Sequence, residues 1–167
     1  MSLRNHYLIL FLLTVAMMAT ALYFQYIVEL EPCPLCISQR IAVIAIGIVA
    51  LVALLHNPSK IGQMIYNSLL LISAISGVAI AGRHVWLQHL PPEQAPACGP
   101  GLEFWLETLP LTTVIEKIFK GTGECAKVDW TFLGFSIPEL TLPTFTLISL
   151  YVIWLIFKSN AAKSNNI

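Results

Sequence analysis

The chain has 167 residues, of which 57% are apolar and only 11% are charged, and its formal net charge is zero. Soluble domains carry roughly 25% charged residues, so this composition excludes an ordinary soluble globular protein.

Four apolar stretches dominate the sequence, and each has about the 20 residues that a helix needs to cross a bilayer. They cover residues 7–28, 37–55, 64–82 and 140–157. We therefore predict an all-α membrane protein, a four-transmembrane-helix bundle that forms a single domain over residues 1–167. The first stretch has features of a signal peptide, with Arg4 before it and an Ala-Thr-Ala sequence at 19–21. Because its apolar run continues to Val28, we expect a retained span.

The charges predict the orientation of the bundle. The cytoplasmic sides of membrane proteins are rich in lysine and arginine in their short segments. Here the N-terminal segment, the 56–63 loop and the C-terminal tail contain Arg4, Lys60, Lys158 and Lys163. All nine acidic residues lie in the loops 29–36 and 83–139. We predict cytoplasmic termini and place these two loops on the other side, although the longer loop also contains three lysines.

A Cys-x-x-Cys pair, Cys33 and Cys36, precedes the second apolar stretch. Pro34 suits the first turn of a helix, which makes Cys33 a plausible N-cap and places Cys36 in the first turn. The positive end of the helix dipole favours a thiolate there. Arg40 follows Cys36 by four residues and shares its helix face. This pattern predicts redox chemistry with a lipid-soluble partner; the alternatives are a structural disulfide and a metal half-site.

All four cysteines, Cys33, Cys36, Cys98 and Cys125, fall in the two outer loops. An even number of cysteines in an oxidising compartment indicates two disulfides. Pairing Cys33 with Cys36 is local and leaves Cys98 with Cys125. Zinc binding by four thiolates is the alternative, but the spacing resembles no zinc ribbon, so we predict no metal site.

The long outer loop has too few apolar residues for a domain of its own. Proline and glycine exclude regular structure between residues 89 and 101, so we expect Cys98 on an extended strip that fits a partner's groove. The alternative is a plain connection. A short amphipathic helix should follow, with residues 111, 114, 115, 118 and 119 on one face and a structural role. His84 and His89 follow the third apolar stretch, where a histidine is usually solvated.

The layout resembles the DsbB family of disulfide bond formation proteins. Residues 31–40, Glu-Pro-Cys-Pro-Leu-Cys-Ile-Ser-Gln-Arg, match that family's Cys-x-x-Cys followed by an arginine four residues after the second cysteine. Further matches are Gly-Glu-Cys-Ala at 123–126, Trp-Thr-Phe-Leu-Gly at 130–134 and the lone Cys98 upstream. The resemblance covers nearly the whole chain and implies a bacterial inner-membrane thiol:quinone oxidoreductase with its cysteines in the periplasm.

The resemblance also implies a role for each site residue. A reduced periplasmic thioredoxin-like oxidase attacks the Cys98–Cys125 disulfide, and Cys98 takes the mixed disulfide. Electrons then pass to the Cys33–Cys36 pair, and Cys36, beside Arg40, reduces a quinone. His89 resembles a histidine that the family places near the quinone. We expect a monomer with no nucleic-acid partner, and either ubiquinone or menaquinone fits.

Two other classes remain open. One is a non-enzymatic membrane scaffold or transporter subunit with two structural disulfides, because closing the 98–125 loop stabilises a fold by about 3.5 kcal/mol in the chain-entropy model. Its test is whether the bridges reduce and reoxidise readily. The other is an enzyme that resembles vitamin K epoxide reductases and in which the electrons flow in the reverse direction. In that family the Cys-x-x-Cys follows the loop cysteines, whereas here it comes first.

Overall fold

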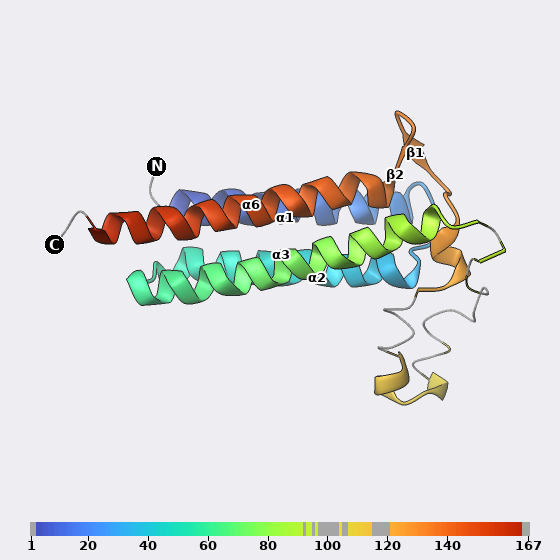
Figure 1. Ribbon diagram of the computed structural model, residues 1–167, viewed down its shortest axis with the longest axis horizontal. Helices are drawn as coiled ribbons and strands as arrows, with labels where there is room; N and C mark the ends of the chain where they lie inside the picture. Colours follow the sequence, from blue (N-terminus) through green and yellow to red (C-terminus); the bar gives the residue numbers. More distant parts are fainter. Residues whose placement is uncertain are drawn as a thin grey trace.

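Four long helices form the molecule, as Figure 1 shows for the computed structural model. The structure describes residues 3–91, 93–94, 96, 104, 107–114 and 121–164, the last six of them by their backbone alone. The helices are α1 (Leu3–Tyr26), α2 (Pro34–His56), α3 (Lys60–Gln88) and α6 (Ile137–Ser164). Within the described residues these four are long and apolar enough to span a membrane. The predicted four-helix membrane fold is therefore confirmed.

Each helix is longer than the apolar stretch that predicted it, and α3 shows the largest consequence. It ends at Gln88, whereas the apolar stretch ended at residue 82. Its buried face continues through Ile80, His84 and Leu87 at helical spacing. His84 thus lies inside a helix and not in a loop, because packing of this face outweighs the polarity of the exposed residues beside it.

The start of α2 has the predicted form. Cys33 is the N-cap with an extended backbone, and Pro34 occupies the first helical position. The Cys36 amide donates to the Cys33 sulfur over 3.4 Å. At the other end, Asn57 closes the helix in the left-handed conformation with φ of 44°. The cap fixes the position of both cysteines relative to the helix axis.

The helices pack in the order α1, α2, α3, α6. Small residues permit close approach, as is usual in membrane bundles. A Cβ atom on Gly77 would lie 2.4 Å from the Phe145 ring, and one on Gly47 would lie 2.8 Å from the Thr14 hydroxyl. Large apolar side chains cover the outer faces of all four helices, as expected of surfaces that contact lipid.

The first and last helices, α1 and α6, touch near the end that carries both termini (Figure 1). There the His6 Nδ1 atom lies 2.5 Å from the Tyr151 hydroxyl, and the Lys158 ammonium lies 3.2 Å from His6 Nε2. His6 is buried although it is polar. These contacts hold the two helices together at this end of the bundle.

The opposite end carries short elements that the sequence did not predict. A 3₁₀ helix, η1 (Gly123–Ala126), precedes an antiparallel hairpin of β1 (Thr131–Phe132) and β2 (Phe135–Ser136). Leu133 and Gly134 turn the hairpin with positive φ angles. Of the predicted amphipathic helix, residues 111–114 are helical, and the rest lies outside the described residues. Cys98 also lies outside them.

Candidate functional site

Three segments far apart in the sequence bring a thiol cluster together. Cys33 comes from the cap of α2, Cys125 from η1 and His84 from α3. The Cys33 sulfur, the Cys125 sulfur and a ring nitrogen of His84 all lie within 4.8 Å of one another. Cys36 adds a fourth group, because its sulfur lies 3.2 Å from that of Cys33. Cys33, a member of the first predicted pair, is therefore also close to Cys125 of the second predicted pair.

Packing of η1 against α2 and α3 places Cys125 there. Cys125 is fully buried in a small apolar cluster with Leu35, Ile80 and Leu87. The chain enters η1 through Gly121, whose φ of +75° favours glycine. A Cβ atom at this position would also lie 2.5 Å from the Leu87 side chain. A glycine thus favours the close approach that carries Cys125 to Cys33.

The described cysteines, Cys33, Cys36 and Cys125, are free thiols in this structure. A hydrogen bond with Cys125 lowers the pKa of Cys33, but the hydrogen bond with Cys36 and burial outweigh it and raise this pKa to about 12. The hydrogen bond with Cys33 and burial raise the pKa of Cys125 as well. Both thiols therefore hold their protons at neutral pH, and exchange between them needs a neighbouring proton acceptor. The His84 Nε2 atom lies 3.7 Å from the Cys33 sulfur, and it can accept a proton when the Gln39 side-chain oxygen is turned toward Nδ1–H.

A cavity of about 610 Å³ opens beside the cluster, between α1 and the outer half of α6. Apolar side chains of both helices line it, including Met17, Phe24 and Phe145. Six polar residues at the start of α2 and the end of α3 line it, namely Cys33, Cys36, Gln39, Arg40, His84 and Gln88. Its outer mouth also carries the charged residues Glu31, Glu124, Lys127 and Asp129. The cavity thus combines an apolar slot with a few converging polar groups, as small-molecule sites do.

Arg40 lines this cavity and forms hydrogen bonds to the neighbouring helix α1. Its guanidinium donates to the Gln25 side chain and, over 3.1 Å, to the Ala21 carbonyl. A side chain that only reached for the lipid headgroups would not need these partners. The predicted location of Arg40 on the face of Cys36 is consistent with both residues lining one cavity.

His84 is a site residue that the sequence analysis did not single out. Its side chain is buried, and its Nδ1 atom lies 3.2 Å from the Gln39 amide nitrogen. The Gln39 carbonyl oxygen accepts in turn from the Thr141 hydroxyl over 2.8 Å. This chain orients the ring so that Nε2 faces Cys33. The sequence signal for a buried His84 was its spacing, because it follows Ile80 by four positions and precedes Leu87 by three, on one apolar face.

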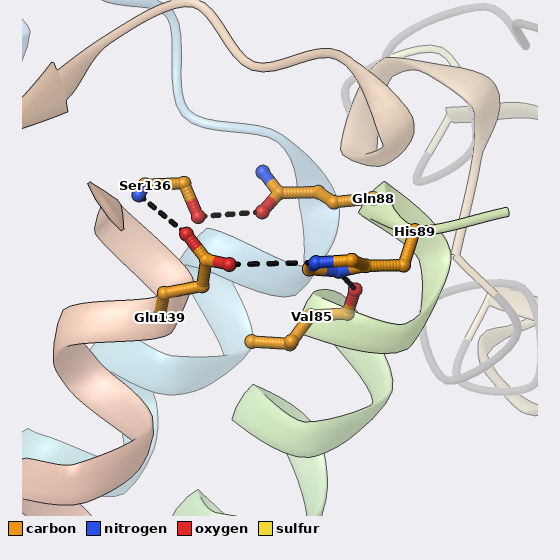
Figure 2. Close-up of polar contacts among 5 residues, drawn as sticks. All are labelled: Val85, Gln88, His89, Ser136 and Glu139. Atoms are coloured by element: carbon orange, nitrogen blue, oxygen red, sulfur yellow. Dashed lines mark hydrogen bonds and ion pairs between the residues drawn. The ribbon is translucent and has the colours of Figure 1, made fainter. Parts of the chain in front are cut away.

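His89 lies elsewhere. Its side chain is 66% exposed, and it is not among the residues that line the cavity. Figure 2 shows its Nε2 atom beside the Glu139 carboxylate, 3.6 Å away, while Nδ1 contacts the Val85 carbonyl. Glu139 also accepts from the Ser136 amide, and the Ser136 hydroxyl donates to Gln88. His89 therefore belongs to a polar brace between α3 and the start of α6.

This chain is similar to known proteins along nearly its whole length. Residues 3–155 match the family described as disulfide bond formation protein DsbB. A protein of Nitrosococcus oceani named disulfide bond formation protein B is 50% identical over 154 residues, which cover 92% of this chain and 91% of the relative. Proteins of the same name from Acinetobacter baumannii and Methylococcus capsulatus are 48% and 51% identical. They cover 90% and 86% of this chain and 88% of each relative.

Proposed function

The chain belongs to the DsbB family of disulfide bond formation proteins, and from this premise we propose which of its residues generate disulfides and where the electrons go. It is a multi-pass membrane oxidoreductase of the family that reoxidises a periplasmic thioredoxin-like oxidase and passes electrons to quinones. The proposed overall reaction converts two thiols of the oxidase and one quinone into one disulfide and one quinol. The observation that carries the assignment is the contact of Cys125 with Cys33, because it joins the two cysteine pairs.

The first steps take place at Cys98 and Cys125. A thiolate of the oxidase attacks the Cys98 sulfur of a Cys98–Cys125 disulfide, and Cys125 leaves. The second thiol of the oxidase then resolves the mixed disulfide, which releases the oxidised partner and a reduced Cys98. Two electrons and two protons have now entered this pair.

Exchange inside the protein follows from the position of Cys33. Cys125 attacks Cys33 in a Cys33–Cys36 disulfide and releases the Cys36 thiolate. Cys98 then attacks Cys125, which restores the first disulfide and frees Cys33. With the Gln39 side-chain oxygen turned toward Nδ1–H, His84 accepts and returns the thiol protons at Nε2, which faces Cys33. The result is a Cys33–Cys36 dithiol at the wall of the cavity.

The residues around the cavity fit a quinone. The apolar wall suits its ring and tail, and Arg40 offers a fixed cation with several donors where charge develops on quinone oxygens. A bound quinone supplies the terminal electron acceptor and takes two electrons and two protons from the dithiol. We assign Arg40 and His84 to this site, and His89 to the brace that holds α3 and α6. Ubiquinone and menaquinone both meet these requirements.

We place the cysteines in the periplasm and both termini in the cytoplasm of the bacterial inner membrane, with one monomeric domain over residues 1–167. The distribution of charges supports this orientation. The termini also share one end of the bundle, opposite the hairpin (Figure 1). In the rival class, with two structural disulfides, no contact between the pairs is required, and the cavity beside Cys36 has no role.

Reconstitution tests the function. The purified full chain, given a reduced thioredoxin-like oxidase and a short-chain quinone, should form one quinol for each oxidase disulfide. Quinone absorbance and thiol titration measure the two products. Omitting the oxidase should stop quinol formation, and omitting quinone should leave only a stoichiometric burst of oxidase oxidation. Oxidation of the oxidase without quinone reduction, sustained over many turnovers, would contradict the proposal.

Cys98 is expected to be the point of entry, since it lies in a proline- and glycine-rich strip that can reach a groove. With Cys125→Ser, an oxidase that lacks its resolving cysteine and carries its remaining cysteine as a mixed disulfide with thionitrobenzoate should be trapped on Cys98. The Cys98 thiolate attacks the oxidase sulfur, and thionitrobenzoate leaves. Mass spectrometry of the cross-linked peptides identifies the cysteine. A trapped species on Cys33 would overturn the order of the relay.

A further inference from the structure

We propose that Cys33, Cys125 and His84, when both thiols are reduced, form a binding site for a soft divalent metal ion of the Zn²⁺ class. These are two sulfur ligands and one imidazole, the ligand types that such ions prefer. The sequence analysis predicted no metal site, but its spacing argument concerned cysteines close together in the sequence. The fold brings these three residues together from three separate segments, so no local sequence motif predicts the site.

The distances suit a tetrahedral ion. Zn–S bonds of about 2.3 Å and Zn–N bonds of about 2.0–2.1 Å require a separation of roughly 3.6 Å between a sulfur and a nitrogen ligand. The Cys33 sulfur and the His84 Nε2 atom lie 3.7 Å apart. All three ligand atoms lie within 4.8 Å of one another. Closing the set on an ion therefore needs shifts of about 1 Å, which leaves a fourth position for a solvent molecule.

The surroundings already provide what orients a metal ligand. A ligating histidine is usually held through its other ring nitrogen by a hydrogen-bonding group. Gln39 holds Nδ1 of His84 here, and Thr141 holds Gln39. The glutamine is itself buried, as are His84 and Cys125. With the Gln39 amide turned over, its oxygen accepts from Nδ1–H, and its NH2 group donates to the Thr141 hydroxyl oxygen, which can still donate to the Pro138 carbonyl. The His84 Nε2 atom is then free for the ion.

Metal binding would oppose the redox cycle without any electron transfer. Coordination releases the protons of the Cys33 and Cys125 thiols and occupies both sulfurs. Neither sulfur can then attack a disulfide. Conversely, a disulfide at either residue removes a ligand, so only the reduced protein binds. The ion should therefore hold the protein in its reduced form when electron acceptors are scarce, and the binding itself does not depend on the proposed reaction.

Titration with Co²⁺ alone tests the site. The detergent-solubilised full chain, fully reduced and free of oxygen, should take up one Co²⁺ and show the visible absorption of a tetrahedral thiolate complex. Cys33→Ser, Cys125→Ser and His84→Gln should each weaken binding by more than about 100-fold, and Gln39→Leu by about 10- to 100-fold. The oxidised protein should bind none. Unlabelled Zn²⁺ should displace the Co²⁺.

Matched variants separate this site from others in the chain. His89→Ala removes an exposed histidine near the end of the same helix. Cys98→Ser and Cys36→Ser each remove a thiol outside the proposed set. All three should bind within about 10-fold of the wild type. If Cys36→Ser abolishes binding and Cys125→Ser does not, the ion sits on the Cys-x-x-Cys pair and the proposal fails. Absence of a tetrahedral spectrum in the wild type would also overturn it, whether or not the protein reduces quinone.

Discussion

Replacing Cys33 with serine should stop quinone reduction, lowering turnover with the reduced oxidase by at least about 1,000-fold. Among the described residues, Cys33 is the cysteine in reach of both Cys36 and Cys125. The Cys98–Cys125 disulfide would remain, so each protein molecule should still oxidise one molecule of oxidase in a single burst. A rapid-quench thiol assay measures this burst, and quinone absorbance measures the loss of turnover.

Serine at position 33 keeps an N-cap oxygen for α2, so the bundle should remain folded. His89→Ala serves as the control because it lies outside the cavity, and it should keep turnover. Sustained quinone reduction by Cys33→Ser would show that electrons reach Cys36 by a route that avoids Cys33. The relay described above would then be wrong.

Replacing Arg40 with methionine should lower kcat/KM for quinone by roughly 10- to 150-fold, the range expected when a hydrogen bond from a charged group worth about 1.5–3 kcal/mol is lost. The change should leave oxidation of the partner by Cys98 and Cys125 intact. Arg40→Lys should recover part of the activity, because lysine keeps the charge but lacks the planar fork. Steady-state kinetics with varied quinone measure the effect.

A matched variant separates the charge from the contact between helices. Gln25→Leu removes one partner of the guanidinium but leaves Arg40 in place, and Gln25 does not line the cavity. We expect a smaller loss for Gln25→Leu than for Arg40→Met. Wild-type quinone kinetics in a well-expressed Arg40→Met protein would return Arg40 to a role at the membrane interface.

The four spans and the Cys33 cap could be predicted because they depend on local patterns, namely apolar length and the position of Pro34. The two histidines show where such patterns fail. A hydropathy criterion ended the third span at residue 82, which left His84 and His89 as equals in a loop. The helix in fact runs to Gln88, and its period turns His84 inward and leaves His89 exposed.

The cluster itself depends on contacts between distant segments. That Cys125 would reach Cys33 follows from the packing of η1 on Leu35 and Leu87, which no spacing in the sequence reveals. The cavity likewise forms between α1 and α6, with α2 and α3 residues on its wall, and these helices come together only in the folded bundle. By contrast, Arg40 and Cys36 were correctly placed on one face, because four residues in a helix always return to the same side.

The contacts of His6 with Tyr151 and Lys158 join α1 to α6 at one end of the bundle, whereas the cavity lies between these helices toward the other end. We therefore expect a quinone with a long tail to enter between α1 and α6 from the lipid, and the quinol to leave the same way. Encounter occurs in two dimensions. The rate should accordingly follow the mole fraction of quinone in the membrane or micelle, and dilution with inert lipid at constant bulk concentration should slow it.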